Sequence, residues 1–563
     1  MKSGAKDRKE ALVGFFTNGW NYVTLAIVVF FGIFFLYPLV SILLHAVYDT
    51  SSHQWDVSQW GVFFGNKYGY YLKTIWNSLK VSFLSALIAT TLGTVLAYIL
   101  RTTKIFGSKI ITVLLMVSMV TPPFLSSYAW VILLGRAGII TKWLAQIGIQ
   151  YGGIYGFGGI IFVFSIKLVP LVNLYVGGAL KQVDVSLMEA SESLGGHGLS
   201  RFFRVTFPLI LPTVLASATL VFMRVISDFG VPALIGEGYR TLPTLVYDMF
   251  TSDVETNEAL AAVTCVITIV ITTLIFLLQR YISSRKKIEM SSLRPVDPKR
   301  RGIGTEIISH ILCYGLMILL IFPLIIIILQ SFKDSVNVVM GGHWSFASYA
   351  EIFQTSSLLK SIGNTFWMSF VALALVVLVG VFIAYCNVRR GSKVTRVIDV
   401  IANVPYIIPG AVMGIALLFS FNNPPLALIG TFTIMIVNFV IRRMPYTIRS
   451  SEAILRQIDL SVEEASESLG CNKFKTFFGI TIPMMAPGVA SGAVMSWLSI
   501  ITELSGSIML YSVKTKTMSI EIFNSISTGY YGRGAALSTI LMLVTTITLL
   551  LFFKLTGRKE ISL

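Results

Sequence analysis

Apolar residues along this chain fall into long continuous runs that are separated by short polar segments. Each run is about 20 residues long, which is the length that an α-helix needs to cross the hydrocarbon core of a bilayer. The 563 residues are 55% hydrophobic and only 13% charged, as in a polytopic membrane protein. The runs predict an all-α membrane protein with about twelve transmembrane helices, near residues 23–47, 74–100, 110–134, 157–179, 209–229, 259–281, 307–331, 364–387, 396–420, 425–441, 484–502 and 535–555.

Two polar segments interrupt this apolar pattern, and they are copies of each other. Residues 184–212 and 459–487 align without a gap at an offset of 275, and about half of the aligned positions are identical. Each copy has a serine three residues before a glutamate, which is the spacing of a capping box, and a glycine six residues after that glutamate. These residues are Ser186, Glu189 and Gly195 in the first copy, and Ser461, Glu464 and Gly470 in the second. The pattern predicts a short helix, a turn at the glycine and a second amphipathic helix at the membrane surface.

Both segments resemble the EAA loop of ABC importer permeases. The matching residues are Glu189, Ala190, Gly195 and Pro212 in the first segment and Glu464, Ala465, Gly470 and Pro487 in the second. The third position of the triplet is Ser191 or Ser466 instead of alanine, a change that keeps the side chain small. The resemblance implies the type I ABC importer permease fold. It also implies that each loop docks in a cleft of a separate ATPase subunit, so that two copies of the ATPase bind one chain.

The two halves of the chain correspond beyond these loops. Asn77, Gly93, Ala97 and Tyr98 match residues of the second half at a common offset of 287. Six spans per half is an even number, so both halves enter the membrane in the same orientation as parallel repeats. We predict a first permease repeat at 1–282, a basic cytoplasmic linker at 283–304 and a second repeat at 305–563.

The distribution of basic residues predicts the orientation of the chain. Of the 44 Lys and Arg residues, 31 lie in segments on the side of the N-terminus and about ten lie in loops on the opposite side. Because positive loops face the cytoplasm, both termini and both EAA-like loops are expected there, with the protein in the bacterial inner or plasma membrane. The net charge of +17 therefore reflects topology among membrane lipids, and a nucleic-acid partner is not expected.

The sequence lacks the motifs of several kinds of chemistry. It has no Gly-Lys-Ser or Gly-Lys-Thr for a nucleotide phosphate, and its histidines and cysteines have no metal-ligand spacing. We therefore expect no enzyme activity, no metal and no cofactor on this chain, with ATP used by the partner subunit. The four cysteines are interpreted as reduced packing residues.

Four ionisable residues lie at membrane depth or at the end of a span, where such residues are functional candidates. Asp228 and Glu503 occupy the same place in the two repeats, since they are 275 residues apart. They are predicted either to face each other along a substrate pathway or to cap the ends of their spans. Arg224, one turn before Asp228, can pair with it, and Lys167 can line the pathway or have a structural role.

Loops on the outer side favour a substrate class. The sequence Asp228–Gly236 (DFGVPALIG), with YRTLPT downstream, is similar to fused permeases of ferric-iron-type importers, which implies ferric iron delivered by an extracytoplasmic solute-binding protein. The segments 229–250 and 504–531 are expected either to receive that protein or to plug the outer mouth. The same machinery for phosphonate, sugar phosphate or thiamine is an alternative. Two rivals of other classes are an ion-coupled secondary transporter and a scaffold or receptor without transport.

Overall fold

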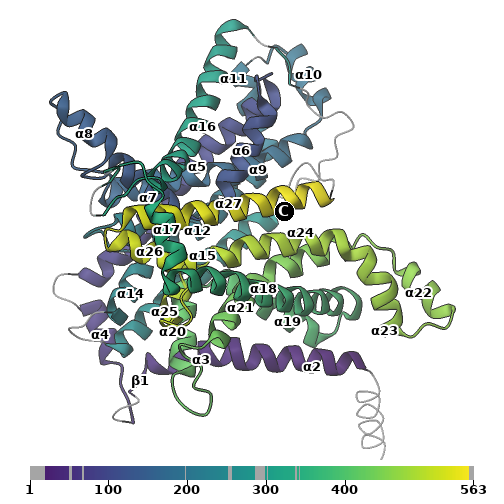
Figure 1. Ribbon diagram of the computed structural model, residues 1–563. Helices are drawn as coiled ribbons and strands as arrows, with labels where there is room; N and C mark the ends of the chain where they lie inside the picture. The colour runs from purple at the N-terminus through teal and green to yellow at the C-terminus, as the bar shows by residue number, and fades with distance from the viewer. Residues whose placement is uncertain are drawn as a thin grey trace, which may run out of the picture. The chain divides into compact units, whose positions relative to one another are not determined.

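The computed structural model describes residues 19–49, 53–65, 69–196, 198–251, 257–285, 298–300, 302–336, 339–341 and 343–556 (Figure 1). These residues are almost entirely helical. Two-residue strands, β1 (Tyr48–Asp49) and β2 (Gln54–Trp55), form one antiparallel pair. Helices of this length suit a bilayer because each one satisfies its backbone hydrogen bonds internally.

The chain folds into two compact units, and their boundaries differ from those of the sequence repeats. The first-half unit holds residues 46–359 and 518–546, and the second-half unit holds 1–45, 360–517 and 547–563. The first span of the chain therefore belongs to the second-half unit. The repeat boundaries at 282 and 305 stay a prediction, and most of the linker lies outside the described residues.

The first-half unit contains the following helices, and Figure 1 labels those for which there is room. They are α4 (Ser58–Gly65), α5 (Tyr70–Thr102), α6 (Ser108–Val120), α7 (Pro123–Leu134), α8 (Ile139–Gln146), α9 (Gly156–Lys181), α10 (Val185–Ser193), α11 (Gly198–Arg201), η2 (Phe202–Thr206), α12 (Phe207–Ile226), α13 (Gly230–Ile235), α14 (Leu242–Thr251), α15 (Glu258–Arg285), α16 (Ile303–Ser331), α17 (Ala347–Gln354) and α26 (Met518–Ser527).

The helices of the second-half unit include those of the first span. They are α2 (Gly19–Phe31), η1 (Gly32–Leu36), α3 (Tyr37–His45), η3 (Cys386–Arg390), α19 (Lys393–Asn403), η4 (Val404–Tyr406), α20 (Gly410–Phe421), α21 (Phe432–Leu455), α22 (Leu460–Ser468), α23 (Lys473–Thr476), η5 (Phe477–Thr481), α24 (Ile482–Ile501) and α25 (Ser507–Leu510). Two further helices, α18 (Ser356–Tyr385) and α27 (Tyr531–Thr556), cross the boundary between the units.

Each half brings matching helices together at a small residue. A Cβ atom on Gly93 of α5 would lie 2.5 Å from the Cβ of Val172 of α9, so only glycine fits there. In the second half, a Cβ on Gly380 of α18 would lie 3.2 Å from Thr447 of α21. These four residues correspond at the offsets of 287 and 275, so the repeat seen in the sequence is also a repeat in packing. Small residues at such contacts let helix backbones approach closely.

The predicted spans are largely confirmed, with three corrections. Ten helices among the described residues are long and apolar enough to cross a membrane, or eleven if a bent pair is one span. The predicted span 110–134 is two helices, α6 and α7, because Pro122 and Pro123 remove backbone donors and favour an extended residue before them. The predicted span 396–420 is also broken, and its parts α19–η4 and α20 meet at 112° around Pro409.

The third correction concerns the predicted span 425–441. Helix α21 begins at Phe432, where the side chain of Thr431 accepts a hydrogen bond from Ile434 N–H, and it continues to Leu455. The prediction ended this span at the first pair of arginines, but Arg442 and Arg443 lie in the middle of the helix. These two arginines were counted among the 31 basic residues on the side of the N-terminus, so that number is too high by two. The excess of basic residues on that side is nearly unchanged.

Candidate functional site

The first turn of each predicted loop helix is capped by an aspartate. The Oδ1 of Asp184 accepts a hydrogen bond from the backbone N–H of Ser186 at 2.9 Å, and Asp459 accepts one from Ser461 at 2.9 Å. The hydrogen bonds from Ser461 lower the pKa of the Asp459 carboxyl. The predicted capping by Ser186 and Ser461 is therefore wrong, because the aspartate two residues earlier reaches the free amides first.

The predicted turn at each glycine is confirmed. Gly195 has φ +82° and Gly470 has φ +89°, a left-handed conformation that glycine adopts without strain. The amide of the residue after each glycine donates back into the helix, to the carbonyl of Ser191 at 2.8 Å and to that of Ser466 at 3.1 Å. This is the Schellman arrangement. The third residue of each triplet thus accepts the hydrogen bond that closes the helix end.

The candidate docking residues are accessible on both loops. All six predicted residues are exposed: Glu189, Ala190 and Gly195, and Glu464, Ala465 and Gly470. Leu194 and Leu469, which precede the glycines, are 89% and 87% exposed. An apolar side chain beside exposed carboxylates, repeated at the same place on both loops, fits a protein-binding surface with an apolar centre and a polar rim.

The second loop is fastened to the end of α18 and to η3 by polar contacts. Arg389 donates from Nε to Glu463 Oε1 at 2.8 Å and from Nη2 to the carbonyl of Ile458 at 2.8 Å. The hydroxyl of Tyr385 donates to the other oxygen of Glu463 at 3.3 Å. Only 6% of the Glu463 side chain is exposed, so its charge is held by these partners.

The first span of the chain also contacts this loop. Trp20, at the start of α2, is 2% exposed and stacks on Tyr385 and Phe474, with ring centroids 4.5 and 4.9 Å away. Arg390 donates to Asn21 and to Thr24 of the same helix. The ring of Trp20 therefore lies between the end of α18 and the start of α23, next to the loop.

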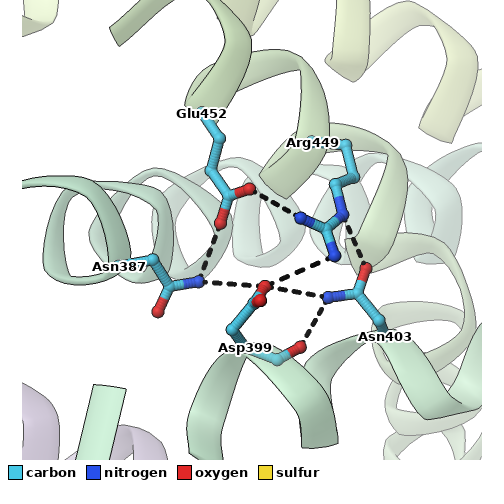
Figure 2. Close-up of polar contacts among 5 residues, drawn as sticks. All are labelled: Asn387, Asp399, Asn403, Arg449 and Glu452. Atoms are coloured by element: carbon cyan, nitrogen blue, oxygen red, sulfur yellow. Dashed lines mark hydrogen bonds and ion pairs between the residues drawn. The ribbon is translucent and has the colours of Figure 1, made fainter. Parts of the chain in front are cut away.

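A polar network joins η3, α19 and α21, and Figure 2 shows its five residues. Arg449 of α21 donates to Glu452 at 2.9 Å and to Asn403 at 3.0 Å, and it pairs with Asp399 of α19 at 3.4 Å. Asn387 of η3 donates to Glu452 at 2.8 Å. The network ties the bent pair α19–α20 to α21, the helix that leads into the second loop.

The first half has no charge at the matching positions of this network. The corresponding residues are Leu100, Thr112, Met116, Leu174 and Gly177. Met188 stands where Glu463 is, and Thr102 stands where Arg389 is. The contacts around the first loop include an ion pair of Arg201 with Glu192 at 3.1 Å. The two loops are thus alike on their exposed side and differ in what supports them.

The two carboxylates predicted for the pathway, Asp228 and Glu503, each accept a hydrogen bond from a backbone N–H group. Asp228 Oδ1 accepts from Val231 N–H at the start of α13, and Glu503 Oε1 accepts from Gly506 N–H just before α25, both at 2.9 Å. Each carboxylate thus holds the start of the short helix that follows its span, and not the end of the span that was predicted. Asp228 and Glu503 lie in different compact units, so the prediction that they face each other is untested.

Glu503 is also the centre of a buried ion cluster. Arg442 and Arg443 of α21 donate to its two carboxylate oxygens, and the Glu503 side chain is 2% exposed. Both oxygens are thus engaged, and the cluster carries two positive charges and one negative charge. Lys167 is buried, and its Nζ donates to the carbonyl of Ser118, which agrees with the structural role considered for it.

The arginines that support these sites were not among the residues predicted from the sequence. Arg442 lies 275 residues after Lys167, so the two basic residues occupy matching positions of the repeats. This match could have indicated that Arg442 lies within a span, as Lys167 does. Arg389, Glu463 and Trp20 had no such signal, because their partners are distant in the chain. Among the described residues, no group of three His, Cys, Asp or Glu side chains is placed to hold a metal.

Comparisons with known proteins match most of the chain. The family model for binding-protein-dependent transport system inner membrane components matches residues 89–288 and 376–558, one segment in each half. The ferric transport system permease protein FbpB of Actinobacillus pleuropneumoniae is 28% identical over 95% of this chain and 78% of its own length. The putative ferric transport system permease protein FbpB 1 of Haemophilus influenzae is 28% identical over 88% and 78%.

A solved structure is similar to half of the chain. It is a bacterial ABC transporter involved in the import of the acidic polysaccharide alginate, with 15% sequence identity and a TM-score of 0.39. The similarity covers 51% of this chain and all of the matched chain.

Proposed function

Because the chain belongs to the family of binding-protein-dependent transport system inner membrane components, we propose that it is the permease of an ATP-driven importer for ferric iron. The family and the apolar helices make it a membrane-embedded ABC importer permease of the type I fold. The observation that supports iron is the match to ferric permeases over nearly the whole chain, across both halves.

In this proposal, two copies of a separate ATPase bind the two loops on the cytoplasmic side. Each copy contacts the exposed Glu189, Ala190 and Gly195, or Glu464, Ala465 and Gly470, with Leu194 or Leu469 as the apolar centre. ATP drives transport only if the ATPase dimer binds one conformation of the permease more tightly than the other. The helix end closed by each Schellman turn gives the ATPase a rigid element to move.

A solute-binding protein is proposed to deliver substrate on the opposite side. The segments 229–250 and 504–531 there fold into short helices, α13 and α14 after one span and α25 and α26 after the other. Short helices held by the caps at Asp228 and Glu503 provide a surface for such a protein without crossing the membrane.

One observation favours a second candidate, the same machinery for an anionic solute such as a phosphonate or a sugar phosphate. The buried cluster of Arg442, Arg443 and Glu503 has a net positive charge, and guanidinium groups bind phosphate oxygens well. If this cluster faces the pathway, its net positive charge would repel a bare ferric cation.

Reconstitution tests the proposal. Proteoliposomes that hold the full chain with its ATPase, given the iron-loaded solute-binding protein, should take up radioactive ferric iron only with ATP. An excess of unlabelled 2-aminoethylphosphonate or glycerol phosphate should not reduce uptake. Uptake driven by an ion gradient without the ATPase would instead indicate a secondary transporter. Absence of iron uptake together with uptake of the phosphonate or the sugar phosphate would select the second candidate.

A further inference from the structure

Helix α19 has polar contacts on one side and exposed apolar residues on another. Asp399 and Asn403 contact Arg449 of α21 in a partly exposed network (Figure 2). On the other side, Val397 and Val400 are 56% and 59% exposed. Apolar side chains that are this exposed suit an apolar surrounding.

A groove runs between this outer face and the first span. The cavity has a volume of about 280 Å³, and its walls are almost entirely apolar. Val28, Phe31 and Leu36 come from the first span, and Val394, Val397 and Ile401 come from α19.

The first half offers a comparison. There α6 corresponds to α19 at the offset of 287, and α6 packs against α16. Ile111 and Leu115 of α6 pack in one buried cluster with Cys313, Leu316 and Met317 of α16. Ile110, the counterpart of Val397, is 66% exposed, so both halves present an apolar outer face here. Phe106 stands where Lys393 is, so the charged end of the groove belongs to the second half.

One end of the groove is positively charged. Lys393 begins α19 and lines the cavity, and Arg396 follows it on the exposed side. The first turn of α19 contains no acidic residue. Both cations therefore lie at the positive end of the helix dipole, where they repel the dipole and each other. A bound anion would relieve this repulsion.

We propose that this groove binds an anionic phospholipid of the surrounding bilayer. One acyl chain lies against the valines of α19 and the first span, and the phosphate group lies at Lys393 and Arg396. An amphiphile with an apolar chain and one negative head matches both ends of the groove. The bilayer supplies such molecules at high local concentration. The lipid thereby joins the first span to α19, whose other face contacts Arg449. This inference does not depend on the transported substrate.

Native mass spectrometry of the purified full chain tests the site. The delipidated protein is titrated with phosphatidylglycerol and, separately, with phosphatidylcholine of the same acyl chains. Wild type should bind one phosphatidylglycerol roughly tenfold more tightly than phosphatidylcholine. The double variant Lys393→Gln/Arg396→Gln should lose this preference, and Val397→Trp, which fills the groove, should weaken the binding of both lipids.

The first half provides the matched control. Lys109→Gln removes a charge from the position of α6 that corresponds to Arg396, where Phe106 replaces Lys393, and it should keep the preference. Equal binding of the two lipids by wild type would overturn the proposal, as would an equal loss in Lys109→Gln. A dimer that Val397→Trp abolishes would assign the groove to a second copy of the chain. The double variant changes exposed side chains only, so its result stands even if Val397→Trp fails to fold.

Discussion

Arg389 Nε lies 2.8 Å from Glu463 Oε1, and this contact fixes the helix of the second loop to the end of a membrane span. The first loop has Met188 in place of the glutamate and Thr102 in place of the arginine. The two loops therefore have similar exposed surfaces but are attached to their halves through different contacts.

The variant Glu463→Met gives the second loop the residue of the first. Arg389 then loses its carboxylate but keeps the Ile458 carbonyl, so we expect a loss of about 2 kcal/mol in stability, below the usual cost of breaking a fully buried pair. Thermal unfolding in detergent measures it. The double variant Arg389→Met/Glu463→Met should recover part of the loss, and strictly additive losses would show that the pair is not coupled.

Trp20→Ala should weaken the second loop although the substitution is in the first span. The ring is buried between Tyr385 and Phe474, and removal of a buried tryptophan ring costs about 3–5 kcal/mol. We expect a lower melting temperature and less transport per ATP hydrolysed. Trp76→Ala is the control, because Trp76 is 62% exposed and its removal should change neither quantity. Equal effects of the two substitutions would contradict the role given to Trp20.

Gly195→Val and Gly470→Val should uncouple ATP hydrolysis from uptake while the spans stay folded. The strain comes from the positive φ and not from a clash, since no heavy atom lies within 4 Å of the added Cβ. A β-branched residue in this conformation costs roughly 1–2 kcal/mol or more and opens the turn. ATPase activity and uptake are measured together in the reconstituted complex. Gly479→Ala, in open space on the same loop and without a positive φ, is the control. Normal uptake in both valine variants would refute this role.

Glu503→Gln should destabilise the protein more than Asp228→Asn. The first substitution leaves two buried guanidinium groups beside a neutral amide, at an expected cost of about 3–5 kcal/mol. In Asp228→Asn the amide oxygen still accepts from Val231, so the loss should be less than about 1 kcal/mol. Unfolding and uptake are compared for both and for the double variant. A stable double variant with normal uptake would exclude both carboxylates from the substrate pathway.

The sequence by itself determined the features that are local in the chain. Runs of apolar residues identified the spans, because a helix in a bilayer needs only its own length and composition. The glycines at 195 and 470 marked their turns, since the left-handed conformation is a property of a single residue. The repeat offset also placed matching residues in matching contacts, as with Gly93 and Gly380.

The tertiary structure decided everything that depends on a distant partner. No local pattern shows that the first span packs with the second half, that Trp20 lies beside Phe474, or that Arg442 and Arg443 are inside a helix to neutralise Glu503. The arginines resembled the start of a loop because isolated charges are costly in a membrane, and only the Glu503 carboxylate, from the turn between α24 and α25, makes their burial favourable.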